Sequence, residues 1–281
     1  MEDWMNRCTL CPRRCGADRT VSVGRCGVGE QVRLARAALH FWEEPCVSGE
    51  EGSGTVFFSG CSLGCVFCQN YQISAGHFGR DIPVERLAEI FLELQEQKAN
   101  NINLVTGGHY IPQIVRALDL VRGKLHIPVV YNSSGYETVE ALRMLKGYVD
   151  VYLPDLKYRS PERSARYSHA PDYFAVASKA ILEMLDQVGP VQFDGQGMIQ
   201  RGLIVRHMVM PNGVEDSMDI LTWIAGNLPL DDILVSVMSQ YTPFYKSGEY
   251  PEIDRRLTAQ EYDRVLDWLD CMGIENGFVQ E

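Results

Sequence analysis

Three closely spaced cysteines constrain this chain more than any other feature of its sequence. Cys61, Cys65 and Cys68 are separated by three residues and then by two, and an aromatic residue, Phe67, precedes the third. Thiolates this close together can converge on one iron–sulfur cluster. Three protein ligands to a four-iron cluster leave one iron open, which is typical of a catalytic metal site. The alternatives are a zinc site or three buried cysteines, although zinc prefers four ligands and usually takes its cysteines in two pairs.

A second group of cysteines lies near the N-terminus. It consists of Cys8, Cys11, Cys15 and Cys26. Cys46 and Cys271 stand alone, and an odd total in two tight groups favours metal binding over a disulfide framework. Four thiolates fit structural zinc or an auxiliary iron–sulfur cluster, and their spacing does not separate the two. Because no helical or strand period appears between these cysteines, we expect this segment to need its metal in order to fold.

The composition is that of an ordinary soluble globular protein. The 281 residues are 46% hydrophobic and 22% charged, which suits one large domain with a small appendage. The net charge of −11 argues against a duplex nucleic-acid partner, which would need a basic face. No apolar run reaches the length of a membrane span, and the first residues lack the regions of a secretory signal. We therefore expect no membrane partner and a cytoplasmic location.

Strand-like and helix-like segments alternate from residue 54 onward. The strands are expected at residues 55–59, 102–105, 127–131, 149–153, 203–210 and 233–238. Strands that alternate with helices predict a parallel sheet with right-handed crossovers, and six units are too few for a closed eight-stranded barrel. The predicted fold class is α/β, an open, partial (βα)6 barrel over residues 51–281. A small cysteine-rich, metal-binding extension precedes it over residues 1–50.

Polar residues and glycines follow the predicted strands, at the end where parallel α/β folds bind ligands. They are Thr106, Gly107 and Gly108 after the second strand, Asn132, Ser133 and Ser134 after the third, Asp155 and Lys157 after the fourth, and Gln240 after the sixth. Two glycines let the backbone approach a ligand closely. Arg206 and His207 are neighbours in the fifth strand, so only one of them is expected to face the cavity. His207 is then either a hydrogen-bonded core histidine or a ligand-binding residue.

In this order the motifs resemble those of the radical S-adenosylmethionine (SAM) superfamily, in particular the pyruvate formate-lyase activating enzymes, which are glycyl-radical activases. The resemblance covers residues 55–241, from the cysteine loop through the two glycines and the Asp155-Leu156-Lys157 run to a strand that ends in Met210-Pro211. The N-terminal cysteines and the run from His40 to Cys46 are similar to an uncharacterised branch of relatives of that family.

The resemblance implies an enzyme with a 4Fe–4S cluster on the three cysteines of the loop, whose open iron chelates SAM. An electron from reduced flavodoxin or ferredoxin would cleave SAM to a 5′-deoxyadenosyl radical for hydrogen abstraction, for example from a glycine of a partner protein. The segment Thr106-Gly107-Gly108 would bind the SAM amine, and Lys157 would pair with the SAM carboxylate. Asp155 would bind a monovalent cation, with Asn132 and Ser133 on its other side.

Some positions depart from the activating-enzyme pattern. His109 and Asn132 stand where acidic residues are usual, and Gln240 stands near the place of a histidine that helps to hold SAM. Gln240 or Tyr241 would substitute for it by hydrogen bonding. The substrate therefore stays open, and the alternatives are a small molecule or a peptide. The adjacent Glu43 and Glu44 either bind a cationic substrate group or are solvated. An alternative of another class is a non-catalytic metal-binding interaction module, in which both cysteine groups are structural.

Overall fold

Ten strands form one sheet in the part of the chain that the computed structural model describes, residues 4–280. The strand order is β10-β9-β8-β6-β5-β4-β2-β1-β3, with β7 paired to β8. The parallel centre consists of β2 (Ser53–Phe58), β4 (Ile102–Val105), β5 (Val129–Ser133), β6 (Val151–Pro154), β8 (Ile199–Met208) and β9 (Leu234–Met238). These are the six strands that the sequence predicts, with ends shifted by a few residues.

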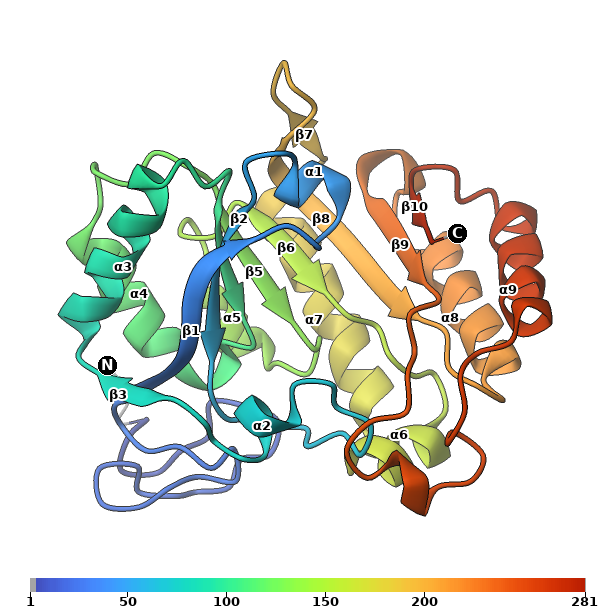
Figure 1. Cartoon of the computed structure of the whole chain (residues 1–281), viewed down its shortest axis with the longest axis horizontal. Helices are drawn as coiled ribbons and strands as arrows, with labels where there is room; N and C mark the ends of the chain where they lie inside the picture. Colours follow the sequence, from blue (N-terminus) through green and yellow to red (C-terminus); the bar gives the residue numbers. More distant parts are fainter. Residues whose placement is uncertain (1–3, 281) are drawn as a thin grey trace.

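Four further strands complete the sheet. They are β1 (Val32–His40) antiparallel to β2, β3 (Arg80–Ile82) antiparallel to β1, β10 (Gly277–Val279) parallel to β9, and the two-residue β7 (Gln192–Phe193) antiparallel to β8. Because β3 and β10 lie at opposite ends of the strand order, the sheet does not close (Figure 1). The predicted open, partial barrel is confirmed.

The strand β1 is absent from the sequence prediction. Most of its side chains are half-buried, and Arg33 and Arg36 interrupt the apolar pattern that would mark a strand. It nevertheless pairs with β2 from Leu34 to His40. The sheet therefore begins within the residues that the sequence analysis assigns to the N-terminal extension.

Helices surround the parallel strands (Figure 1). They are α3 (Val84–Glu96), α4 (Ile111–Leu120), α5 (Val139–Arg143), α6 (Pro161–Ser168), α7 (Tyr173–Val188), α8 (Val214–Asn227) and α9 (Ala259–Cys271). Each long helix buries an apolar stripe. On α7, for example, Ala177, Ile181 and Met184 are fully buried. No helix among the described residues has the length and apolar character needed to cross a membrane.

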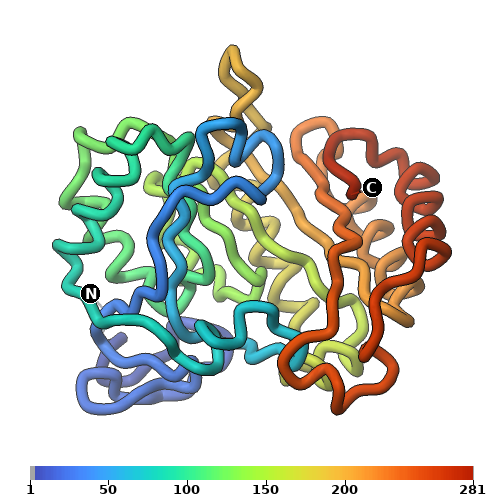
Figure 2. Tube along the Cα trace, viewed as in Figure 1, coloured from blue at the N-terminus to red at the C-terminus, as the bar shows by residue number. Residues whose placement is uncertain are grey.

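Short helical turns complete the chain: α1 (Pro45–Ser48), α2 (Tyr71–Ser74), η1 (Gly108–Tyr110), η2 (Leu230–Asp232) and η3 (Ser247–Glu249). The helix α9 begins with the predicted capping box, in which Thr258 and Glu261 each accept a hydrogen bond from the other's backbone amide. The N-terminal segment, blue in Figure 2, lies beside the loop that follows β2, at the carboxyl end of the parallel strands.

Candidate active site

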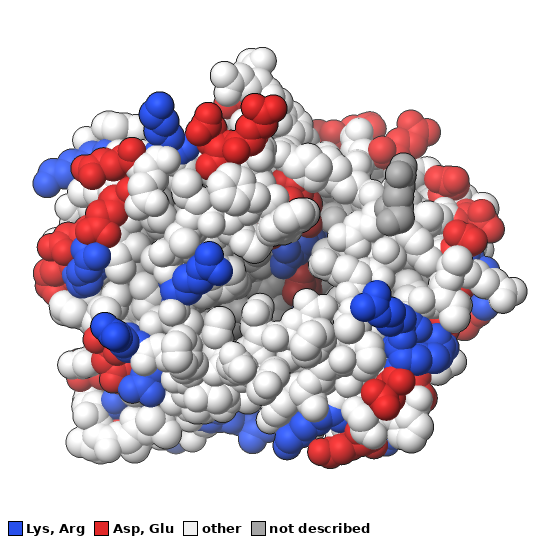
Figure 3. Space-filling model, in the orientation of Figure 1, with Lys and Arg blue, Asp and Glu red and all other residues white. Residues whose placement is uncertain are grey.

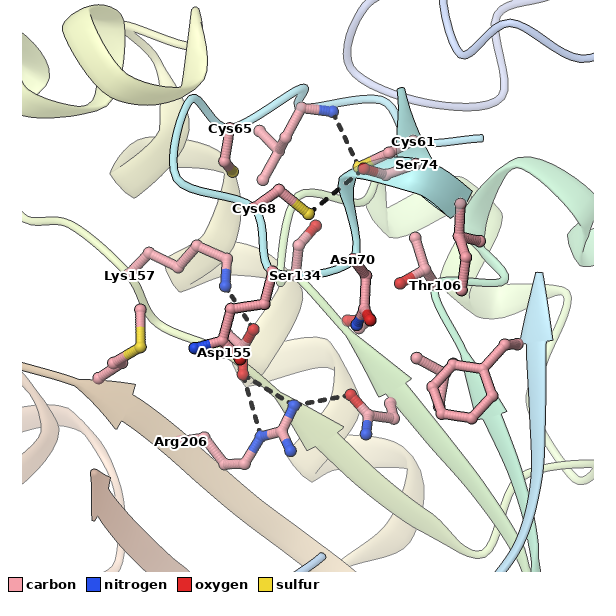
Figure 4. A pocket seen from close by; sticks show the side chains of 18 of the residues that line it. Cys61, Cys65, Cys68, Asn70, Ser74, Thr106, Ser134, Asp155, Lys157 and Arg206 are labelled. Carbon is pink, nitrogen blue, oxygen red and sulfur yellow. Dashed lines mark hydrogen bonds and ion pairs between the residues drawn. The ribbon is translucent and has the colours of Figure 1, made fainter. Parts of the chain in front are cut away.

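A cavity of about 460 Å³ lies at the carboxyl ends of the parallel strands. Figure 3 shows the hollowed face, with charged side chains in its depth. The predicted site residues that line it are Cys61, Cys65, Cys68, Thr106, Asn132, Ser133, Ser134, Asp155, Lys157 and Gln240. The fold thus brings residues from four strand ends and from the cysteine loop (residues 59–70) around one cavity (Figure 4).

The cysteine loop turns sharply so that all three of its thiols line the cavity. Gly60 and Gly64 adopt φ angles of +88° and +71°, a region that favours glycine. The loop also supplies a hydrogen-bond donor to sulfur, because the amide of Leu63 lies 3.4 Å from Cys61 Sγ. Cys68 Sγ lies 3.3 Å from the hydroxyl of Ser74 on α2.

The third thiol receives its hydrogen bond from a distant helix. Ser168 at the end of α6 places its hydroxyl 2.9 Å from Cys65 Sγ. Burial raises the pKa of Cys65 to about 12, while the Lys157 ammonium acts against this rise. Burial likewise raises the pKa of Cys61. Binding to iron would offset this cost because metal ligation favours the thiolate.

None of the nine cysteines forms a disulfide bond. Among residues 4–280, no three His, Cys, Asp or Glu side chains meet closely enough to hold a single metal ion. Three thiols on one loop, facing one cavity and supplied with hydrogen-bond donors, fit the donor set of an iron–sulfur cluster.

A network of half-buried charges forms the wall opposite the cysteine loop (Figure 4). Asp155 binds Lys157 Nζ through Oδ2 at 2.5 Å and Arg206 Nε through Oδ1 at 3.0 Å. The Arg206 guanidinium also donates to Glu43 Oε2 at 3.0 Å and to Asn132 Oδ1 at 2.7 Å. The network therefore joins three strand ends to the segment between β1 and α1.

Lys157 and Arg206 hold Asp155 ionised, whereas burial raises the pKa of Glu43 despite its contact with Arg206. Burial raises the pKa of Asp155, but Arg206 and Lys157 outweigh it, so the pKa lies below its ordinary value. Burial lowers the pKa of Lys157, and Asp155 more than restores it. Lys157 thus remains a cation at the edge of the cavity, where it can meet the carboxylate of a ligand.

Comparison with known protein families identifies the superfamily of this chain. The model of the radical SAM superfamily matches residues 55–221, more than half of the chain. The chain belongs to the radical SAM superfamily. It is 35% identical over 277 residues to Uncharacterized protein MJ0674 of Methanocaldococcus jannaschii, a match that covers 95% of this chain and 75% of the relative.

Solved structures of radical SAM proteins share the fold. Methylornithine synthase (PylB) superposes with a TM-score of 0.53 at 14% identity, over 78% of this chain and 68% of that one. SuiB of Streptococcus suis, bound to S-adenosylmethionine, gives a TM-score of 0.53 at 12% identity, over 79% of this chain and 48% of that one. Membership of the superfamily implies an enzyme that uses a 4Fe–4S cluster and SAM.

The glycine motif after β4 lies at the cavity edge of this radical SAM barrel. Thr106 lines the cavity with a φ angle of +59°, whereas Gly107 and Gly108 lie directly behind it. A Cβ on Gly107 would meet Ile114 at 2.7 Å, and one on Gly108 would meet Glu137 at 3.1 Å. Both glycines therefore serve close packing of the backbone against the core.

Two histidines point away from the radical SAM cavity. Both ring nitrogens of buried His207 are paired, with Leu156 O at 2.7 Å and Ser217 Oγ at 2.8 Å. The ligand-binding alternative for His207 is thus wrong, because the strand register turns Arg206 into the cavity instead. His109 bonds Ser59 O at 2.8 Å, and burial lowers its pKa to about 4.

The positive partner of Asp155 also differs from the expectation of a monovalent cation. The Arg206 guanidinium binds both Asp155 and Asn132, and Asn132 donates in turn to Glu43 Oε1 at 3.2 Å. Ser133 faces Glu137, to which it donates at 3.1 Å. A side chain of the protein thus occupies the position between Asp155 and Asn132.

The sequence analysis leaves the role of Glu43 and Glu44 open and misses Glu137. Glu43 is paired with Arg206 and lines the cavity, so the solvated alternative is wrong for it. Glu44 is buried as well, and its Oε2 lacks a hydrogen-bond partner. Glu137 is buried behind Ser133, and burial raises its pKa to about 7. Only the aromatic residues around the Glu43-Glu44 pair could have signalled a non-solvated position.

The N-terminal cysteines gather around a tight turn. Cys8 and Cys26 are buried, and a Cβ on Gly24 would lie 3.4 Å from Cys26 Sγ and 3.5 Å from Cys15 Sγ. Burial raises the pKa of Cys11 to about 11, and the other three cysteines add to this rise. The four thiols interact electrostatically, but no three of them meet closely enough in the described part of the chain to hold a single metal ion.

Proposed function

We propose that this radical SAM enzyme reductively cleaves SAM and abstracts hydrogen from a glycine of a partner protein, in the manner of the glycyl-radical activases. The main support is that the thiols of Cys61, Cys65 and Cys68 and the Asp155–Lys157 ion pair line one cavity in a chain of this superfamily. The bound cluster and SAM would supply a one-electron cleavage to methionine and a 5′-deoxyadenosyl radical.

The residues of the chain would hold SAM by its charged end. Lys157 would share its ammonium between Asp155 and the SAM carboxylate as a charge-assisted pair. The backbone of Thr106, which lines the cavity, would face the SAM amine, and Gly107 and Gly108 would support it from behind. Ser133, Ser134 and Gln240 line the same cavity and would offer hydrogen bonds to the rest of SAM.

The end of the cavity near Glu43 would receive the substrate. His40, Trp42 and Phe57 line it there, and Trp42 is 87% exposed. Large aromatic side chains at an open mouth suit contact with a protein segment. A small molecule or a peptide is the alternative, because the same cavity would admit either.

The N-terminal cysteines would hold a second metal. We propose structural zinc, because the four cysteines of this segment interact electrostatically and would supply the four thiolate ligands of a closed tetrahedral site. An auxiliary iron–sulfur cluster is the alternative.

The test is turnover of the anaerobically reconstituted protein with SAM. Reduced flavodoxin or ferredoxin serves as the electron donor, as we expect for a cytoplasmic enzyme. We expect a brown protein that forms 5′-deoxyadenosine. Addition of the partner protein captured from the native lysate should give a glycyl-radical signal in electron paramagnetic resonance. Turnover stimulated only by a small-molecule extract would replace the activase part of the proposal. A colourless zinc protein without turnover would favour the non-catalytic interaction module.

A further inference from the structure

The N-terminal segment contacts the cysteine loop through its backbone. We call residues 8–26, which carry the four N-terminal cysteines, the N-terminal knuckle. The carbonyl of Cys26 accepts a hydrogen bond from the amide of Cys61 at 3.2 Å. A Cβ on Gly60 would lie 2.6 Å from that same carbonyl oxygen. The backbones of the two segments therefore lie so close together that only glycine fits at this position. The last residue of one cysteine group thus bonds the first residue of the other.

Arg13 makes the largest set of contacts between the two segments. Its Nε donates to Ser62 O at 2.8 Å, and Nη2 donates to Ser168 O at 3.0 Å and lies 3.4 Å from Leu63 O. Nη1 donates to His169 O. The planar guanidinium carries five N–H donors in a fixed geometry, which suits several carbonyls at once. Arg13 therefore ties the cysteine loop to the end of α6.

The end of α6 in turn carries the hydrogen bond to a thiol of the cysteine loop. Ser168 is fully buried, and its hydroxyl donates to Cys65 Sγ at 2.9 Å. The hydroxyl of Tyr158 lies 2.8 Å from Ser168 Oγ and orients it. One side chain, Arg13, thereby fixes both the loop that carries Cys65 and the backbone of the residue that bonds its sulfur.

We propose that Arg13 is a positioning residue through which the N-terminal knuckle holds the cysteine loop and the Ser168–Cys65 hydrogen bond in place, and so sets the reduction potential of the cluster. This inference rests on the proposed function, because it places a cluster on Cys65. Hydrogen bonds to ligating sulfurs are among the features that set cluster potentials. A donor to sulfur stabilises the reduced form, which carries the additional electron, so its loss lowers the potential.

The experiment compares Arg13→Gln, Arg13→Lys and Ser168→Ala in the full-length, anaerobically reconstituted protein. Arg14→Gln is the matched control, because Arg14 is exposed, carries the same charge one residue further on and makes no described side-chain contact. The measurements are the midpoint potential of the cluster by redox titration with electron paramagnetic resonance, and amide hydrogen exchange of residues 61–66.

We expect a lower midpoint potential in Ser168→Ala with amide exchange of the loop unchanged. Arg13→Gln should lower the midpoint potential and raise the amide exchange rate of residues 61–66 at least tenfold. Arg13→Lys keeps the positive charge but not the planar set of N–H donors, so its potential and exchange rate should lie between those of Arg13→Gln and the wild type. The proposal is overturned if Arg13→Gln has the same midpoint potential and exchange rates as Arg14→Gln. It is also overturned if Ser168→Ala has the midpoint potential of the wild type.

Different results would contradict the proposed function and the positioning role of Arg13. If the wild-type protein holds no redox-active cluster, the proposed function fails before any variant is made. The exchange comparison between Arg13→Gln and Arg14→Gln still reports on the contact in that case. Faster loop exchange in Arg13→Gln would then retain the positioning role without the effect on potential.

Discussion

At the scale of single residues, the site depends on one half-buried carboxylate between two cations. Asp155 would be costly to bury as an ion, and Lys157 and Arg206 offset that cost on its two oxygens. Arg206 is held in turn by Glu43 and Asn132, so its position is fixed before any ligand binds. Lys157 has fewer partners, which leaves its remaining donors available to a carboxylate in the cavity.

The first prediction concerns this lysine. Lys157→Met keeps the bulk of the side chain but removes the ammonium, and we expect SAM binding to weaken by about 1.5–3 kcal/mol. Anaerobic calorimetry or equilibrium dialysis measures the change, with Lys179→Met on the exposed side of α7 as the control. Equal SAM affinity in both variants would mean that Lys157 serves only as the ion-pair partner of Asp155.

The second prediction concerns Glu137, whose pKa burial raises to about 7. Its ionisation in the folded state is then disfavoured, so the folded protein holds a proton between about pH 4.5 and 7 that the unfolded chain has released. The wild type therefore loses stability as the pH rises through this range. Glu137→Gln removes that loss, and its free energy of unfolding relative to wild type should rise by up to about 3 kcal/mol between pH 5 and pH 8.

Urea unfolding at the two pH values measures this difference. Glu140→Gln is the control, since Glu140 is exposed in the first turn of α5. A relative stability of Glu137→Gln that is the same at pH 5 and pH 8 would show that the carboxyl titrates normally.

At the scale of elements, the cysteine loop is shaped by two glycines that have different surroundings. Both have positive φ angles, but a Cβ on Gly64 would meet nothing within 4 Å, whereas one on Gly60 would meet Cys26 O at 2.6 Å and Val28 at 2.8 Å. Substitution of Gly64 therefore tests backbone strain alone, whereas substitution of Gly60 tests backbone strain together with the contact to the N-terminal knuckle.

The third prediction compares alanine at these two positions. Gly64→Ala should cost about 1–2 kcal/mol through backbone strain alone. Gly60→Ala should cost more than that, because the loop must also move away from Cys26 and break its bond to Cys61. Denaturant unfolding gives the two free energies, and the iron content after reconstitution reports on the loop. Equal losses of unfolding free energy in the two variants would contradict the close contact between Gly60 and Cys26.

The sequence predicts the parallel elements well and the antiparallel ones poorly. Continuous apolar strands such as Ile204-Val205 stand out because both faces are buried, whereas β1 is half-buried and interrupted by arginines. The choice between Arg206 and His207 also escapes the sequence. It depends on the register of β8 against β9, which pairs Arg206 with Ser236, and only tertiary structure fixes that register.

At the scale of the whole molecule, two cysteine groups more than thirty residues apart in sequence lie in contact. The cysteine spacings predict two separate sites, and the structure adds that Arg13 and Cys26 join them. Long-range contacts of this kind have no sequence signal, since a single arginine that bonds backbone carbonyls is compatible with many partners.

The fourth prediction tests the N-terminal metal. Metal analysis of the anaerobic protein should show about one zinc per chain beside the iron. Cys11→Ala should lose that zinc and lower the stability of the N-terminal segment, because we expect the segment to need its metal in order to fold. A second set of iron–sulfur signals that disappears in Cys11→Ala would establish an auxiliary cluster in place of zinc.

The most direct test of the central claim is SAM cleavage by the reconstituted protein and by Cys65→Ala. Cys271→Ala is the matched control, because Cys271 is an exposed thiol at the end of α9. We expect 5′-deoxyadenosine from the wild type and from Cys271→Ala, and none from Cys65→Ala, since a cluster left with two thiolates is labile. Formation of 5′-deoxyadenosine by Cys65→Ala at the wild-type rate would contradict the assignment of the cluster to the cysteine loop.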